Sequence, residues 1–426
     1  VSADVVTSGG DVRLIAQLNR TGVVADDWGV DFTTQASFPT DFETGEGDFI
    51  VTVEASAATF QDINLRRYGT NNRFNVTTTT GDISISANIG PYWNYNTPVR
   101  GIMNLVSETG DILLWANKDA GNRSYWSSGT IQTSGLMNFD LPRVYFYAGQ
   151  TFTGSGHVVI PEVFGDWGDN VRFGPNLTGL QIGDGGVNSG QLDLTGAQIS
   201  INGPISIDVR KLTFGGDALL ESTSQSADIE ISVSAAAATI PAGTSILSSG
   251  GDINLDTEKE LIVGGSITAG GSGNINLYPK HLNLTGSLNA PNGRVLVSGQ
   301  SRFATTDYQV TLVTISDSEV DRINTPHLTF ESIGNIVFDD PISFPQPDVV
   351  LAAVSNVLQN SGATIAATNF AISRSNLVNL PEANGVTGNL AIRANNVTYS
   401  SAVNYTAATV SGITPQFGIP VSISMT

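Results

Sequence analysis

Three aspartates stand in glycine-rich segments, a setting in which carboxylates can hold a hard cation. Asp166 and Asp169 belong to Gly-Asp-Trp-Gly-Asp-Asn at 165–170, and Asp184 belongs to Gly-Asp-Gly-Gly at 183–186. Because Ca²⁺ takes oxygen ligands from such loops, these residues form a candidate calcium site. Their spacing matches neither an EF-hand nor a repeated Gly-Gly-x-Gly-x-Asp array. Turn-forming aspartate is therefore the favoured interpretation, and calcium is the one cofactor that the sequence suggests.

Clustered aromatic side chains form a second candidate site. Tyr92, Trp93 and Tyr95 stand beside asparagines, and Tyr125 and Trp126 follow Asn-Arg-Ser in a second segment. Sugar rings stack on such aromatics while amide and guanidinium groups bond their hydroxyls, so these residues are candidates for contact with a glycan or a receptor. The alternative is that they pack against the side of the fold.

The three histidines predict no catalytic or metal centre. His157, His281 and His327 lie far apart and share no ligand spacing, so each is expected to be a surface or strand residue. The chain contains no Gly-x-Ser-x-Gly, His-Glu-x-x-His or phosphate-loop motif.

Carboxylates leave one enzymatic alternative open. Asp26-Asp27 and Asp339-Asp340 are adjacent pairs, but neighbours on a strand point to opposite faces and cannot act together. A polysaccharide-cleaving enzyme needs two carboxylates on one face, and stacking around Asp166 to Asp184 would supply them. A solvated acidic ladder would have the same sequence, so a non-enzymatic protein is preferred.

A recurring phrase identifies the elements that must position these residues. A glycine and an Asp or Asn precede alternating apolar and polar residues at Gly10-Asp11, Gly81-Asp82, Gly110-Asp111, Gly251-Asp252 and Gly273-Asn274. Gly251, Gly273 and Gly293 are separated by 22 and 20 residues. Recurrence at this period with strand-type alternation predicts a parallel β-helix, an all-β solenoid with turns about 4.8 Å apart.

The chemistry of the phrase predicts its geometry. Glycine supplies positive φ or a close backbone approach at a corner, and Asp or Asn bonds nearby backbone amides. The following residues then run straight, with Ile253 and Leu255 facing inward and Asn254 outward.

The regularity of the phrase divides one continuous solenoid into three segments. Residues 1–174 combine it with aromatic loop insertions, residues 175–300 are regular, and residues 301–426 are a less regular continuation. Inserted loops are where function is usually mounted. A short helix is expected within Pro347 to Val357.

Composition favours a secreted protein and excludes several partners. The chain of 426 residues has 46 glycines, no cysteine and a formal net charge of −20. Nucleic acid is excluded as a partner because phosphate contacts need clustered Lys and Arg. The chain has no uninterrupted run of 18 apolar residues, so no membrane-spanning helix is predicted. Without cysteine there is neither a disulfide framework nor a thiolate metal site.

Within residues 240–300, the patterns Ile-x-Ala, Gly-Gly-Asp-Ile-x-Leu and Gly-x-Ile-x-Ala resemble the stalk repeats of filamentous haemagglutinin-like exoproteins, the bacterial adhesins of two-partner secretion. The resemblance implies a right-handed parallel β-helix at the bacterial cell surface or outside the cell, acting in adhesion or in a biofilm matrix. That family carries Asn-Pro-Asn motifs at its N-terminus. Here Ala290-Pro291-Asn292-Gly293 lies deep in the chain and lacks the first Asn, so no secretion role is transferred to it.

The two ends of the sequence enter and leave the repeat without a cap. Alternation begins near Val5 and continues to Met425, so both ends are expected to be interior cuts or surfaces that something else completes. The preferred function is a non-enzymatic stalk presenting binding loops to a glycan or protein of a host or neighbouring cell. The alternative is a filament or matrix subunit in which copies pair end to end.

Overall fold

The protein is described by a computed structural model. The described residues are 12–17, 30–32, 40–41, 49–55, 58–61, 63–64, 73–78, 82–87, 102–116, 124–126, 129–140, 144–146, 150–163, 165–166, 171–183, 190–299, 313–314, 316–404 and 406–407. They form two units. Unit 1 comprises Val1–Thr213 with Ala218–Ser222, and unit 2 comprises Phe214–Asp217 with Thr223–Thr426. The boundary falls inside the segment expected to be most regular, and each unit is described by itself.

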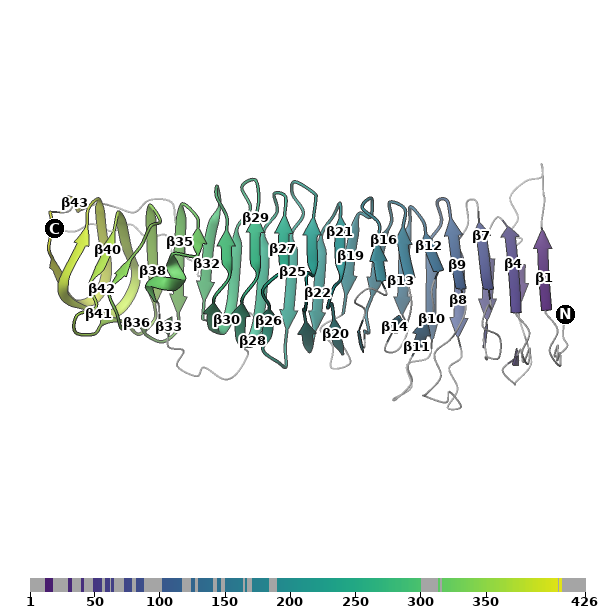
Figure 1. Cartoon of the computed structure of the whole chain (residues 1–426), viewed down its shortest axis with the longest axis horizontal. Helices are drawn as coiled ribbons and strands as arrows, with labels where there is room; N and C mark the ends of the chain where they lie inside the picture. Colours follow the sequence, from purple (N-terminus) through teal and green to yellow (C-terminus); the bar gives the residue numbers. More distant parts are fainter. Residues whose placement is uncertain are drawn as a thin grey trace. The chain divides into compact units, whose positions relative to one another are not determined.

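Unit 1 is built from parallel strands that pair with their counterparts one turn along the chain (Figure 1). One series is β1 (Val12–Gln17), β4 (Phe49–Ala55), β7 (Arg73–Thr78), β9 (Ile102–Ser107), β12 (Gly129–Gln132), β15 (Gln150–Thr153), β18 (Val171–Phe173), β21 (Gln198–Ile201) and β24 (Leu219–Ser222). A second series is β2 (Val30–Phe32), β5 (Ala58–Gln61), β8 (Ile83–Ala87), β10 (Ile112–Ala116), β13 (Leu136–Asp140), β16 (His157–Ile160), β19 (Gly179–Ile182) and β22 (Ile205–Val209). Shorter parallel sets join β3 (Thr40–Asp41) to β6 (Ile63–Asn64), β11 (Ser124–Trp126) to β14 (Val144–Phe146), and β17 (Gly165–Asp166) to β20 (Gln191–Asp193) and β23 (Lys211–Thr213).

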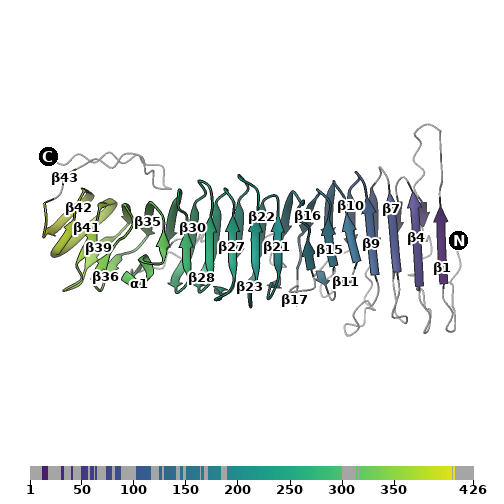
Figure 2. The same cartoon turned by 45° about the horizontal axis from the view of Figure 1, so that its top comes forward.

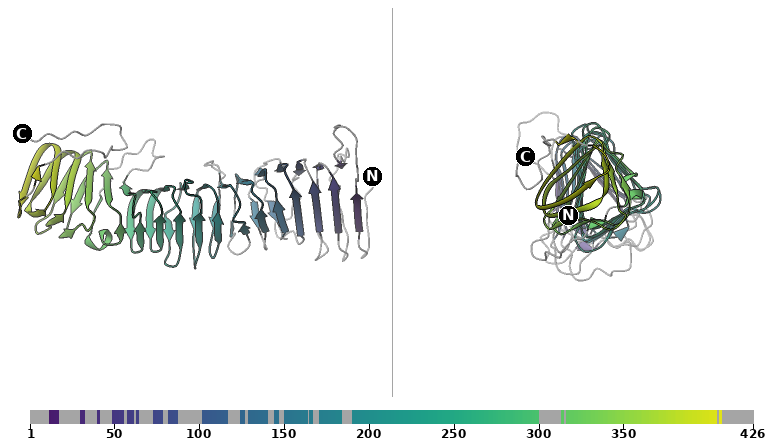
Figure 3. Two further views of the ribbon diagram at one scale, coloured as in Figure 1. Left: turned by 90° about the horizontal axis from the view of Figure 1, so that it is seen from above. Right: turned by 90° about the vertical axis from the view of Figure 1, so that its left-hand side faces the viewer.

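Unit 2 follows the same plan. Its longest series is β25 (Ile229–Val233), β28 (Ile253–Val263), β30 (Ile275–Leu284), β32 (Arg294–Ser298), β35 (His327–Ser332), β38 (Asp348–Ala353), β41 (Asn369–Val386), β42 (Asn389–Ser401) and β43 (Thr406–Ala407). Further parallel sets are β27 (Ser245–Ser248), β29 (Ser266–Ala269), β31 (Ser287–Asn289) and β34 (Ile323–Asn324); β26 (Ala238–Ile240) with β28; β33 (Val313–Thr314), β36 (Ile336–Phe338) and β39 (Asn356–Gln359); and β37 (Ile342–Ser343) with β40 (Ile365–Ala367). In the end-on view of Figure 3 the yellow-green strands of this unit surround a common centre.

Apolar side chains stack in columns along the interior of each unit. In unit 1 one fully buried column contains Ile83, Ile112, Met137, Val158, Leu180 and Ile205. In unit 2 the corresponding column contains Ile229, Ile253, Ile275, Val295, Leu328, Val349, Phe370 and Leu390. The predicted parallel, all-β solenoid is thus confirmed in both units, and Ile253 and Leu255 are buried as expected. The hand of the helix stays a prediction.

Part of unit 2 departs from simple alternation. Asn254 is half-buried as an outward residue should be, but its counterparts Asn276, Leu296, Thr329 and Val350 on the next turns are buried. Strands β30, β32, β35 and β38 therefore bury both faces over this region, which gives them near-continuous buried runs.

The prediction of a helix within Pro347 to Val357 is wrong. That segment forms β38 and β39 instead, with Val349, Leu351 and Ala353 fully buried. Its β-branched valines favour strands, and tertiary burial on the existing apolar columns decides the outcome. The described helix is α1 (Asp317–Val320), which lies at the edge of the unit 2 strands (Figure 2). Glu319 Oε2 accepts hydrogen bonds from the Ser316 backbone N–H (3.2 Å) and hydroxyl (2.7 Å) at its start.

Candidate functional site

The recurring Asp and Asn residues of unit 2 form a ladder of side-chain hydrogen bonds between turns. Asp228 Oδ1 accepts the backbone N–H of Asp252 at 2.7 Å, and Asp252 Oδ1 accepts the backbone N–H of Asn274 at 2.8 Å. The Asn274 side-chain amide also donates to Asp252 Oδ1 at 3.0 Å. Asn274 Oδ1 then accepts the backbone N–H of Arg294 at 2.9 Å. Each corner thus satisfies a backbone donor of the following turn, whereas the sequence predicted only a bond to a nearby backbone amide.

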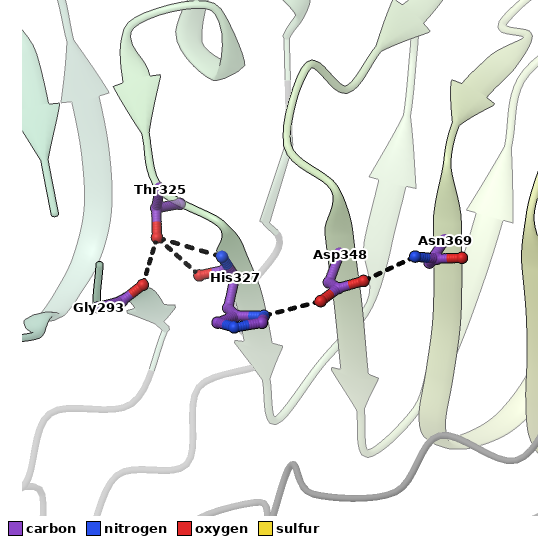
Figure 4. Close-up of polar contacts among 5 residues, drawn as sticks. All are labelled: Gly293, Thr325, His327, Asp348 and Asn369. Carbon is purple, nitrogen blue, oxygen red and sulfur yellow. Dashed lines mark hydrogen bonds and ion pairs between the residues drawn. The ribbon is translucent and has the colours of Figure 1, made fainter. Parts of the chain in front are cut away.

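The ladder changes chemistry beyond Arg294 (Figure 4). The Thr325 hydroxyl donates to the Gly293 carbonyl at 2.9 Å and accepts the His327 backbone N–H at 3.3 Å. His327 Nδ1 lies 2.8 Å from Asp348 Oδ2, and Asn369 Nδ2 donates to Asp348 Oδ1 at 2.8 Å. A threonine hydroxyl and a histidine–aspartate pair therefore continue the link between turns.

Asn389 continues this series. Its backbone N–H donates to Asn369 Oδ1 at 2.9 Å. The side chains of His327 and Asp348 are 48% and 35% exposed, so solvent screens their pairing. Sequence reasoning missed this pair, although the 21 residues between the two positions match one turn of the solenoid.

Unit 1 has a shorter version of the ladder. Asp82 Oδ1 accepts the backbone N–H of Asp111 at 2.8 Å, and Asp111 Oδ1 accepts that of Leu136 at 2.8 Å. Leu136 has no side-chain acceptor, and the equivalent residue of the next turn is His157. The polar ladder of these described turns therefore ends at Leu136 while the apolar column continues.

Close backbone approach explains the glycines that precede the corner residues Asp252 and Asn274. A Cβ on Gly251 would lie 2.1 Å from the Ala227 carbonyl oxygen, and one on Gly273 would lie 2.3 Å from the Gly251 carbonyl oxygen. Neither glycine has the positive φ seen at Gly243 and Gly271. Of the two reasons that the sequence offered for these corner glycines, steric exclusion is the one confirmed. Gly110 is buried and its carbonyl oxygen lies 2.8 Å from a Cβ built on Gly135, whereas Gly10, Asp11 and Gly81 lie outside the described residues.

A buried amide pair stabilises the last turns of unit 2. Asn384, fully buried, accepts hydrogen bonds at Oδ1 from Gln359 Nε2 at 2.7 Å and from the Ile365 backbone N–H at 2.9 Å. Its own amide donates to the Leu380 carbonyl at 3.3 Å and the Ser400 carbonyl at 3.2 Å. The pair satisfies buried backbone groups on three segments, which is what a buried polar group must do to be tolerated.

The predicted calcium residues are only partly described. Asp166 lies in β17, where its backbone pairs in register with Asp193 of β20 rather than with the segment at Asp184. Asp193 Oδ1 accepts hydrogen bonds from the Thr195 backbone N–H (3.0 Å) and hydroxyl (2.7 Å), so this aspartate forms a turn. Asp169 and Asp184 lie outside the described residues. Among those described, no group of three metal-ligating side chains is present.

Only two of the five aromatic candidates lie among the described residues. Tyr92, Trp93 and Tyr95 lie outside the described residues. Tyr125 and Trp126 lie on β11, whose backbone pairs in parallel with β14 so that Tyr125 is in register with Tyr145 and Trp126 with Phe146. The structure therefore gives a small parallel sheet where the sequence suggested an exposed loop.

The histidines occupy three different environments. His157 lies against Gly179, where an added Cβ would be 2.1 Å from its Nδ1 atom. Burial lowers the pKa of this imidazole from 6.5, because the charged form loses hydration. His281 is exposed on β30, and His327 pairs with Asp348.

None of the helical structure in the described residues has the length and apolarity that a bilayer crossing requires.

The candidate site is the ladder itself. Its side chains link the strands of successive turns, and its exposed side can accept hydrogen bonds from external donors. Compared with known proteins, the chain matches no family model, no curated protein and no solved structure.

Proposed function

We propose that this chain is a non-enzymatic structural and adhesive β-solenoid of a secreted bacterial surface protein. In this role the stacked turns form a stalk, and segments inserted between the turns contact glycans or proteins of a host or neighbouring cell. The resemblance of residues 240–300 to adhesin stalk repeats supports the same function.

The observation that carries the proposal is that an apolar column and a polar ladder run side by side through the turns of unit 2. A fully buried apolar column runs from Ile229 to Leu390, and the polar links from Asp228 to Asn389 follow the same succession of turns at the corner. Each turn contacts its neighbours in both columns, so the spacing between turns is fixed locally and repeated. A scaffold that holds ligand-binding segments at set intervals needs this property.

Binding and cleavage measured in the same sample test the proposal. The purified chain is incubated with beads carrying bacterial or host polysaccharides, and both retained protein and newly formed reducing ends are quantified. Retention without new reducing ends is expected. New reducing ends would overturn the non-enzymatic function, and absence of retention would overturn the adhesive one. The variant Trp93→Ala/Trp126→Ala is expected to lose retention, and full retention would overturn the assignment of contact to those segments.

A second candidate function, end-to-end assembly, is favoured by the last turns of unit 2. Val357 and Val378 are fully buried, whereas Val397, next in the same column, is 49% exposed. Among the described residues, β42 pairs with β43 only at Asn389 and Leu390, so the rest of its outer edge is unpaired there. An exposed valine on a strand edge that is unpaired among the described residues favours the addition of another strand.

Negative-stain microscopy over a concentration series distinguishes the two functions. A stalk gives separate particles at every concentration, whereas a matrix subunit gives polymers with a regular axial repeat. Val397→Asp should abolish such polymers because it places a charge in the apolar contact. Polymers that persist in this variant would exclude this end as the contact.

A further inference from the structure

Two consecutive turns of unit 2 repeat a pattern of exposed arginine and asparagine. Arg374 and Asn376 lie on β41, and Arg393 and Asn395 lie at the corresponding place on β42. The register is irregular between Ile372 and Ser375 and then pairs Ser375 with Ala394, the residues that directly follow Arg374 and Arg393. All four side chains are exposed, so the two turns present the same groups side by side.

Neither guanidinium has a partner within the described part of the chain. No hydrogen bond or ion pair joins Arg374 or Arg393 to a described residue, although the chain has 39 acidic and 19 basic residues. Adjacent turns are about 4.8 Å apart, a distance at which two like charges repel. Two unpaired cations on neighbouring turns of an acidic protein therefore form a site of positive potential that an external anion would neutralise.

The neighbouring groups restrict which anion fits. Asn395 Nδ2 donates to Asn376 Oδ1 at 3.1 Å, which fixes the two amides to each other. The Asn376 amide N–H groups and the Asn395 carbonyl oxygen are left available to a ligand. Val354, at the corner of the preceding turn, is 41% exposed and adds an apolar surface. The site thus offers two guanidinium forks, amide donors and acceptors, and an apolar contact.

We propose that Arg374, Asn376, Arg393 and Asn395 bind an acidic polysaccharide, a polymer of uronic acid residues. Its carboxylates match the guanidinium forks, its hydroxyl groups match the amides, and the C–H face of its ring matches Val354. Arginines on successive turns favour a ligand whose charges repeat along a chain. This inference names a partner class for the adhesive function proposed above, but it rests on other residues than the aromatic segments.

Binding to immobilised polygalacturonate, with chelator present and dextran as the neutral polymer, tests the site. We expect the parent chain to bind polygalacturonate and not dextran. Arg374→Ala/Arg393→Ala should weaken binding by about tenfold or more, since each arginine contributes charge-assisted hydrogen bonds. Arg374→Lys/Arg393→Lys keeps the charge but loses the forked guanidinium donors. Its affinity should therefore lie between that of the parent chain and that of the double alanine variant.

The matched control is Lys259→Ala/Lys280→Ala. These two exposed lysines also lie on adjacent turns, on β28 and β30, and their removal changes the net charge equally. The control should bind like the parent. An equal loss in both double variants would mean non-specific attraction and overturn the site, as would unchanged binding of the arginine variant or binding to phosphatidylglycerol vesicles in preference to the polysaccharide. Unchanged retention on polygalacturonate in Trp93→Ala/Trp126→Ala would separate this site from the aromatic one.

Discussion

The two units use different residues at the corner that precedes each strand of the fully buried apolar column. Unit 1 passes from Asp82 and Asp111 to Leu136 and then His157, whereas unit 2 keeps hydrogen-bonding side chains on turn after turn from Asp228 to Asn389. The apolar column beside the corner is fully buried in both units. The described turns of unit 1 thus continue without the polar ladder, whereas the apolar column is continuous in both units, and the following predictions test that difference.

The largest effect should come from the apolar column, and it should be equal in the two units. Ile112→Ala in unit 1 and Ile275→Ala in unit 2 each remove fully buried atoms. Each should lower the free energy of unfolding by about 3 kcal/mol. Denaturant unfolding followed by circular dichroism measures both. A loss confined to one variant would show that the two units do not depend equally on their cores.

The corner glycines should come next. An added Cβ would lie 2.1 Å from the Gly135 carbonyl oxygen at Gly156 and 2.3 Å from the Gly251 carbonyl oxygen at Gly273. Gly156→Ala and Gly273→Ala must displace a neighbouring backbone, which should cost about 1–3 kcal/mol.

Gly385→Ala is the matched control, because its nearest atom would be 4.0 Å away. Its midpoint of denaturation should stay near that of the parent chain. If all three variants unfolded alike, close approach would not be the reason for glycine at the corners.

The ladder itself should contribute less, and more in unit 2 than in unit 1. Asp252 accepts two hydrogen bonds from Asn274, whereas Asp111 accepts one from Leu136. Asp252→Ala should cost about 1–2 kcal/mol and Asp111→Ala about 1 kcal/mol, since each leaves a part-buried N–H without its acceptor. Faster hydrogen exchange at the Asn274 and Leu136 amides would locate each effect. Asp252→Asn keeps an acceptor oxygen and should exchange like the parent, and slow exchange in Asp252→Ala would contradict the ladder.

Much of this fold could be predicted from the sequence because its signals are local. The alternation after Gly251-Asp252 and the spacing to Gly273 fixed the strand, the corner and the turn length, and the structure confirms all three. The expected helix within Pro347 to Val357 failed because helix and strand are close alternatives for a short apolar run. There the stacked column decides, and burial of Val349 favours the strand.

The candidate sites were harder to predict because they depend on which residues share a column across turns. His327 and Asp348, or Arg374 and Arg393, are neighbours only once the register is known. Insertions change the length of each turn, so counting residues gives the partner only where turns are regular. Asp166 shows the same limit, since its register partner is Asp193 rather than the nearer Asp184.

The smallest effect should distinguish the units by pH. In unit 1 the corner after Leu136 is His157, whose pKa is lowered from 6.5 by burial against Gly179. The unfolded chain then binds a proton more tightly than the folded one, so the stabilising contribution is complete above pH 6.5 and is lost as the pH falls through 6.5 towards the lowered value. His157→Gln removes this titration. The difference in unfolding free energy between parent and variant should therefore shrink or change sign from pH 8 to pH 5. A difference that stays constant over this range would show that the imidazole is as well hydrated in the folded protein as in the unfolded chain.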